Sequence, residues 1–216
     1  MRLGALHPVA ARLEHLAAAF AALLFGCLVP SVGSAQNITT DGSLGAKVTL
    51  AGPSYPITAN LGKQVGGNLF HSFGVFGLNK GESATFSGPG PVTNVIGRVT
   101  GGAASSINGK IDSSSLVGAN LYLVNPSGIV FGPNATVNVS GSFHASTADY
   151  IRLADGAKFQ ATNPSGSTLS AAAPAAFGFL TASPPAITVD GSQLGVTTAG
   201  ATLGIVGGPV SDQPYG

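Results

Sequence analysis

The stretch Asn120-Leu-Tyr-Leu-Val-Asn-Pro-Ser-Gly-Ile-Val-Phe131 places two short runs of strand-forming residues on either side of a tight turn. In a type I turn, Asn at the first position can hydrogen-bond back to the backbone, Pro presets φ at the second, and Ser and Gly suit the last two. We therefore predict strands over Asn120–Val124 and Ile129–Phe131, joined by the turn Asn125–Gly128. In a parallel solenoid such turns stack about 4.8 Å apart, and their Asn side chains would form a ladder.

The rest of the chain after residue 35 has the same character. Sustained helical periodicity is missing, whereas short β-type runs alternate with turn pairs such as Asp155-Gly156. Further strands are predicted at 68–76, 84–86, 92–100, 107–111, 136–139, 150–153 and 186–189. This pattern predicts an all-β chain, and both a sandwich and a solenoid remain open.

A second Asn-Pro-Ser-Gly copy stands at 163–166, which is 38 residues after the copy at 125–128. Two coils of about 19 residues would give this spacing, near the low end of solenoid repeats. Small residues within the strands also suit closely stacked coils. Because two copies establish a period only weakly, these observations leave the sandwich and the solenoid about equally favoured.

The composition excludes several classes of function. Asp, Glu, Lys and Arg make up 8% of the residues, against about 25% in an average soluble domain. The formal net charge is +1, and the basic residues are scattered singly. We therefore predict no nucleic-acid partner and no polybasic membrane contact, because both need clustered Lys and Arg. An apolar content of 44% is enough for a packed core.

The first 35 residues are predicted to be a secretory signal peptide. Arg2 and Arg12 form a positive region, 16–29 is almost wholly apolar, and Gly33-Ser34-Ala35 offers a cleavage site before Gln36. We therefore expect export to the periplasm and on to the cell surface or medium. Cys27 is the single cysteine and lies inside this segment, so the mature chain would contain no disulfide.

The chain is poor in candidate catalytic and metal-binding residues. His71 and His144 are the only histidines after the signal peptide, and neither stands near clustered Cys or carboxylates, so we predict no metal and no cofactor. Ser72 and His71 are neighbours in one predicted strand and point to opposite faces. They therefore make no triad with Asp149.

Two alternative functions remain. A pectin-lyase-like, carbohydrate-active β-helix enzyme would need carboxylates clustered with an Arg in one groove, and the nearest acids are Asp149 and Asp155, with Arg152 between them. We predict that the chain is not an enzyme. A free-standing surface adhesin would need exposed aromatic side chains, and the sequence does not show which of Phe70, Phe73, Phe76, Tyr122 and Phe131 are exposed.

Five ordered sequence blocks resemble the two-partner secretion domain, also called the haemagglutination-activity domain, at the N-terminus of filamentous-haemagglutinin-like exoproteins. The resemblance covers about Ile38 to Phe179. The blocks are Asn68-Leu-Phe-His-Ser-Phe73, Arg98-Val-Thr-Gly-Gly102, Ile107-Asn-Gly-Lys-Ile111, the stretch from Asn120 to Ala135, and Gly141-Ser-Phe-His-Ala-Ser-Thr-Ala148.

The resemblance implies the fold class, a right-handed single-stranded parallel β-helix with an N-terminal cap. We expect the β-helix domain over 36–180 and the start of further coils over 181–216. At roughly 20 residues per coil, the mature chain would form about nine coils. The predicted core residues are Leu121, Leu123, Ile129, Phe131, Val137 and Val139.

The resemblance also implies the function, namely to direct a larger exoprotein through a partner outer-membrane transporter with periplasmic POTRA domains and to nucleate folding of the β-helix. The sequence leaves a host-cell or other surface ligand open. The predicted recognition residues are Asn125, Pro126, Ser127, Gly128, Ile129, Asn68 and Arg98, although Arg98 fits a structural role better than a partner contact. The family usually has Asn where this chain has Ser127. We expect the turn to survive this change, whereas a contact made by that Asn is put in doubt.

Overall fold

The computed structural model describes residues 38–213. Regular structure in this range consists of β-strands and two single-turn 3-10 helices, η1 (Ala59–Leu61) and η2 (Pro164–Gly166), which confirms the prediction of an all-β chain. The predicted signal peptide, residues 1–35, lies outside the described residues. Between residues 38 and 213, no helix is long and apolar enough to cross a membrane.

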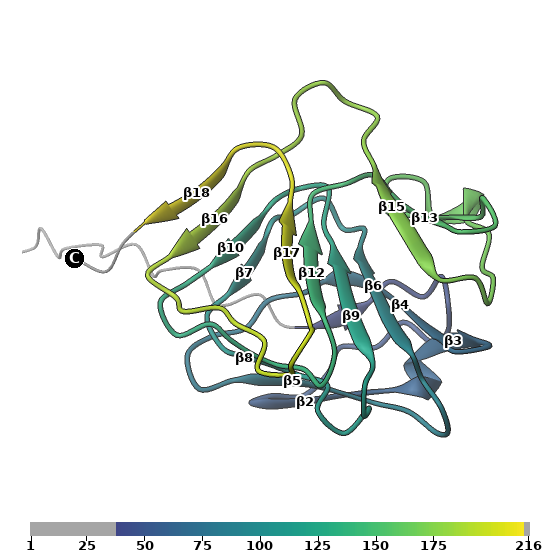
Figure 1. The fold of residues 1–216 in the computed structure, drawn as a ribbon, viewed down its shortest axis with the longest axis horizontal. Helices are drawn as coiled ribbons and strands as arrows, with labels where there is room; N and C mark the ends of the chain where they lie inside the picture. The colour runs from purple at the N-terminus through teal and green to yellow at the C-terminus, as the bar shows by residue number, and fades with distance from the viewer. Residues whose placement is uncertain (1–37, 214–216) are drawn as a thin grey trace, which may run out of the picture. The chain divides into compact units, whose positions relative to one another are not determined.

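Sheet A is the longest of three sheets that run along a stack of coils (Figure 1). Five of its strands are parallel neighbours in the order β4, β6, β9, β12, β17, whereas β1 and β3 pair antiparallel with β4 and cap the N-terminal end. The strands of sheet A are β1 (Thr39–Thr40), β3 (Gly62–Val65), β4 (Asn68–Val75), β6 (Asn94–Val99), β9 (Asn120–Val124), β12 (Phe143–Ser146) and β17 (Leu203–Val206).

Sheets B and C form the other two sides of each coil. In the central turns the chain passes from B to A to C, for example through β5, β6 and β7 and then through β8, β9 and β10. Sheet B contains β2 (Ser54–Thr58), β5 (Ser83–Ser87), β8 (Lys110–Asp112) and β11 (Thr136–Asn138). Sheet C contains β7 (Ser105–Ile107), β10 (Ile129–Phe131), β16 (Ile187–Asp190) and β18 (Val210–Gln213). The fold is therefore a parallel β-helix, as predicted.

The coils are longer and fewer than predicted. Asn68, Asn94 and Asn120 lie side by side on β4, β6 and β9, and each is 26 residues from the next. The prediction of nine coils of about 20 residues is therefore wrong. The predicted coil length rested on the two Asn-Pro-Ser-Gly copies. The second copy forms η2 outside the coils, where Gly166 N donates to the Asn163 carbonyl.

The predicted strand 107–111 is also wrong, because the chain turns a corner inside it. β7 ends at Ile107 and β8 begins at Lys110, and the two belong to different sheets. Gly109 lies between them against earlier backbone, where an added Cβ would come within 2.4 Å of the Glu82 carbonyl oxygen. Only glycine fits this corner, which explains the sharp change of direction.

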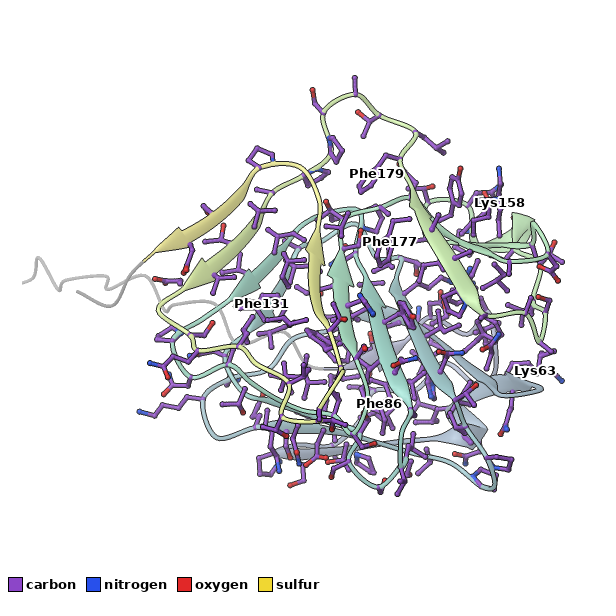
Figure 2. All side chains as sticks on the ribbon, in the orientation of Figure 1. Lys63, Phe86, Phe131, Lys158, Phe177 and Phe179 are labelled. Carbon is purple, nitrogen blue, oxygen red and sulfur yellow. The ribbon has the colours of Figure 1, made fainter. Side chains whose placement is uncertain are left out.

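Apolar side chains from sheets A, B and C fill the interior of the coils, and Figure 2 shows Phe86 and Phe131 among them. Five of the six predicted core residues are at most 4% exposed, and the sixth, Val137, is partly buried against them. Each buried Leu, Ile or Phe contributes about 1.5–3 kcal/mol of hydrophobic stabilisation. The interior is therefore a large source of stability for the stack, and residues 38–213 contain no cysteine.

Between β12 and β16 the chain leaves the coil and forms a small antiparallel sheet D (Figure 1). Its strands are β13 (Tyr150–Leu153), β14 (Lys158–Gln160) and β15 (Pro174–Gly178). We call residues 149–180 the excursion. Its apolar side chains pack on the outer face of sheet A and make a second hydrophobic core there. The buried members of this core are Phe70, Ile96, Val124, Ala148, Ile151, Leu153, Phe159 and Ala161.

Candidate recognition site

The predicted recognition turn joins β9 to β10, at the corner between sheets A and C. Gly128 N donates to the Asn125 carbonyl at 3.1 Å, and Ser127 N donates to Asn125 Oδ1 at 2.9 Å. Gly128 has a φ of +113°, in the left-handed region that glycine tolerates. The turn therefore forms with Ser at its third position, as expected.

The Asn125 side chain is fully buried and fastens this turn to the preceding coil. Its Nδ2 donates to the Ala103 carbonyl at 3.0 Å and to Ser105 Oγ at 2.9 Å. The expected ladder of asparagines at this turn is therefore wrong, because the partners of Asn125 are a backbone carbonyl and a serine. Ile129 is buried as well, whereas Pro126 and Ser127 are half-buried. Of the side chains predicted for this turn, those two reach the surface.

Asn68 belongs to an asparagine ladder elsewhere, at the start of the strands of sheet A. Asn94 Nδ2 donates to Asn68 Oδ1 at 2.9 Å, and Asn120 Nδ2 donates to Asn94 Oδ1 at 3.1 Å. Ser142 N donates to Asn120 Oδ1 at 2.9 Å, while Asn68 Nδ2 donates to carbonyls in the excursion. A backbone donor stands at one end and backbone acceptors at the other, so both ends fix the orientation of every amide between them.

Arg98 lies on β6 and is 1% exposed. Its Nε donates to Ser72 Oγ at 2.7 Å and one Nη donates to Ser43 Oγ at 3.0 Å. The other Nη donates to the Gln160 carbonyl and to Ser167 Oγ in the excursion. Burial lowers the pKa of the guanidinium to about 10, so it stays charged at neutral pH. The structure places Arg98 where the N-terminal segment, sheet A and the excursion meet.

Asp41 completes this junction, although the sequence did not mark it. Its Oδ2 accepts hydrogen bonds from Ser72 Oγ at 2.6 Å and from Thr100 Oγ1 at 2.9 Å, and its Oδ1 accepts from Ser43. Burial raises the pKa of the carboxyl, but these hydrogen bonds outweigh it and hold the pKa below its usual value. Ser72 therefore links Asp41 to Arg98, which excludes it from a triad with His71.

The predicted recognition residues do not gather in one place. Arg98 pairs with Val124, the residue before the turn, whereas Asn68 and Asn94 stand at the opposite end of the strands. The side chains of Asn68, Arg98 and Asn125 all donate hydrogen bonds to partners within the chain. The three residues hold the fold together, which leaves the surface of the turn as the accessible part of the predicted set.

The two histidines occupy different environments. His71 is fully buried between Phe73 and Phe86, and neither ring nitrogen has a hydrogen-bond partner. Burial lowers its pKa to about 4, although the nearby backbone of Leu61 favours the charged form. His144 is half-buried and stacks on Tyr122 with ring centroids 4.7 Å apart, and burial lowers its pKa too. Both rings therefore pack as aromatic groups in the neutral form.

The aromatic residues named in the adhesin hypothesis are mostly internal. Four of the five are at most 1% exposed, namely Phe70, Phe73, Phe76 and Phe131. The fifth, Tyr122, is half-buried beside His144 and lies 6.5 Å from the Phe177 ring. These five side chains therefore supply almost no exposed aromatic surface.

The acids near Arg152 do not converge on it. Asp149 Oδ2 accepts from Leu180 N at 2.6 Å, while Asp155 Oδ1 accepts from Ala157 N within its turn. The ion pair that the structure shows within residues 38–213 joins Lys110 and Asp112 at 2.9 Å. In the same range, no three His, Cys, Asp or Glu residues come together as metal ligands.

A shallow groove of about 310 Å³ crosses the corner between sheets B and C. It is lined by Gly81, Glu82, Ser83, Gly109, Lys110, Asn134 and Thr136. Glu82 is the only carboxylate in this lining, and it already accepts a hydrogen bond from Asn79 N at 2.7 Å. The groove therefore lacks the paired carboxylates that glycoside hydrolysis uses.

Comparison with known proteins agrees with the resemblance drawn from the sequence blocks. Residues 36–213 match the family described as the TPS secretion domain. Over 86 residues, the chain is 38% identical to a heme/hemopexin-binding protein of Haemophilus influenzae. That alignment covers 40% of this chain and 9% of the relative, so the chain spans a small part of the relative's length.

Proposed function

This chain belongs to the TPS secretion domain family, and we propose that it directs an exoprotein through a partner outer-membrane transporter. One observation carries the proposal: the family match over 36–213 spans the whole coil stack, from β1 to β18. Fold alone would be weak support, because many functions share the solenoid architecture. The family match supplies the specific link to two-partner secretion.

The coil stack supports the second half of the proposal, that the domain nucleates folding of the β-helix. In sheet A, β6, β9, β12 and β17 each pair with a strand of the preceding coil, and Asn94 and Asn120 of the ladder bond to residues 26 positions away. Such a stack can grow coil by coil from its N-terminal cap as the chain emerges. We propose that the POTRA domains of the transporter engage the chain in the periplasm.

The experiment is secretion of the full chain with and without a co-expressed partner transporter. We expect the chain in the medium when the transporter is present, with Gln36 as its first residue, and in the periplasm when it is absent. A transporter that lacks its POTRA domains is the matched control. Equal amounts in the medium under all three conditions would overturn the proposal.

We propose that the surface of the turn, Pro126 and Ser127, takes part in recognition, because these two side chains are half-buried whereas Asn125 and Ile129 are buried. Ser127→Tyr is expected to lower secretion at least about fivefold without changing the unfolding midpoint, since surface changes typically cost under about 0.5 kcal/mol. Val117→Tyr is the control, at a position 88% exposed in another loop. Equal secretion of both variants would show that the turn serves the fold alone.

We propose further that the domain is not an enzyme. The support is the scattered placement of Asp149, Asp155 and Glu82, each of which is engaged by a backbone N–H group. The part aligned with this chain covers 9% of the Haemophilus heme/hemopexin-binding protein, so the ligand in that protein's name does not carry over to this domain.

A further inference from the structure

The excursion is tied at its base by Asp149. The backbone N of Asp149 donates to the Gly178 carbonyl at 2.9 Å, and its carbonyl accepts from Ala161 N at 2.7 Å. Its Oδ2 accepts from Leu180 N at 2.6 Å. Together with the antiparallel pairing of β13 with β14 and β15, these bonds make the excursion a unit with hydrogen bonds of its own.

The excursion is attached to coils that come much earlier in the chain. Asn68 Nδ2 donates to the Ser170 carbonyl at 2.9 Å and to the Ala172 carbonyl at 2.7 Å, across 102 and 104 residues. Arg98 bonds to Ser167 across 69 residues, and its guanidinium carbon lies 4.3 Å from the centre of the Phe159 ring. Figure 1 shows β13 and β15 beside the strands of sheet A rather than within the stack.

The apolar contacts repeat this arrangement. Phe159 packs on Phe70 with ring centroids 5.0 Å apart, and Phe177 lies beside Tyr122. Phe70, Tyr122 and Arg98 come from β4, β9 and β6, three strands of three successive coils. The surface that receives the excursion therefore exists only after these coils have stacked, since no single coil contains it.

We propose that the excursion is a latch that closes last over the stacked coils and controls how slowly the folded domain unfolds. Contacts between the neighbouring coils that precede the excursion join residues about 26 apart, whereas the latch contacts join residues 55 to 104 apart and need a composite surface. Closing a longer loop also costs more entropy. The coils therefore form before the latch, and opening of the latch precedes their separation.

Folding kinetics of the full chain test this order. Phe159→Ala removes latch contacts with Phe70 and Arg98, and we expect it to speed unfolding by at least about tenfold while changing refolding less than about twofold. Leu121→Ala, in the interior of the coils, is the matched control, and we expect it to slow refolding by at least about tenfold. Both residues are 1% exposed, so the two truncations are comparable. Slower refolding of Phe159→Ala, to the same extent as Leu121→Ala, would overturn the proposal.

Hydrogen exchange on the unaltered chain decides the question even where a variant fails to fold. The amides of Ala161, Thr168 and Leu180 are bonded within the excursion, and those of β9 are bonded between coils. We expect the excursion amides to exchange through an opening that leaves β9 protected, at least about tenfold faster. Equal protection in the two groups would show a single cooperative unit and would refute a latch.

Discussion

The coil stack and the excursion are held by different kinds of contact. In the stack, neutral side chains such as Asn94 and Asn134 bond to residues 26 positions away, and the same bond recurs from coil to coil. The excursion is attached to the stack by the second hydrophobic core and by polar contacts centred on the buried charge of Arg98 and on Asn68. A repeated contact spreads stability along the chain, whereas a single charged junction concentrates it. The two regions should therefore respond very differently to the loss of one side chain.

The largest effect is expected at the charged junction. Arg98→Ala would remove the donors to Ser72, Ser43 and the excursion and would leave the Asp41 carboxylate without its counter-charge. We expect the free energy of unfolding, measured by urea titration, to fall by about 3–5 kcal/mol. Arg152→Ala is the control, because that side chain is exposed on β13, and a change below about 0.5 kcal/mol is expected. An equal fall in the free energy of unfolding for both variants would contradict a stabilising role for the charged junction at Arg98.

The buried imidazole of His71 makes the coil stack sensitive to acid. Its pKa is about 4 when folded against an ordinary value of 6.5, so the unfolded chain binds more protons between these two values. Stability therefore rises with pH through this window, and about 3 kcal/mol is lost as the pH falls from 6.5 to 4. Urea titrations of the full chain and of His71→Phe across pH 4–7 measure this loss. A slope that persists undiminished in His71→Phe would assign the acid sensitivity to other groups.

A smaller loss is expected from the ladder. Asn94→Ala would leave Asn68 Oδ1 without its donor and Asn120 Nδ2 without its acceptor, both in a largely buried environment. We expect a loss of about 2–3 kcal/mol in the free energy of unfolding. Asn134→Ala removes an exposed member of another pair, with Asn108, and should cost at most about 1 kcal/mol. Similar costs for the two variants would mean that burial adds nothing to the ladder.

Local sequence was sufficient to place several strands. Asn120–Val124, Ile129–Phe131 and Tyr150–Leu153 have the predicted bounds, because runs of apolar and aromatic residues end there at turn pairs. The coil length was missed although a signal was present. Asn-Leu-Phe, Asn-Val-Ile and Asn-Leu-Tyr begin at 68, 94 and 120, and they are the three stacked rows of sheet A. The parallel β-helix itself came from the family resemblance, since composition and turns fitted a sandwich equally well.

The junction and most of the excursion were beyond local reasoning. The turn pair Asp155-Gly156 is typical of an antiparallel hairpin between β13 and β14, whereas β15 pairs with β13 across a long connection that carries no such turn signal. Arg98 is the only charged residue of the buried strand β6, and its role depends on Ser43 and Ser167, which are 55 and 69 residues away. Such roles are properties of the assembled surface, which explains why the predicted recognition set mixed a surface turn with residues that hold the fold.

The amide dipoles of the asparagine ladder all point in one direction along the stack. From Ser142 through Asn120 and Asn94 to Asn68, every donor points toward the N-terminal cap, so the amide dipoles align head to tail. Hydrogen bonds in such a row polarise one another, by about 10–30% per bond. The row of hydrogen bonds ends in the excursion, where the carbonyls of Ser170 and Ala172 accept from Asn68. A coil added in the reverse sense would set donor against donor or acceptor against acceptor, so the row of amides favours growth of the solenoid in one orientation.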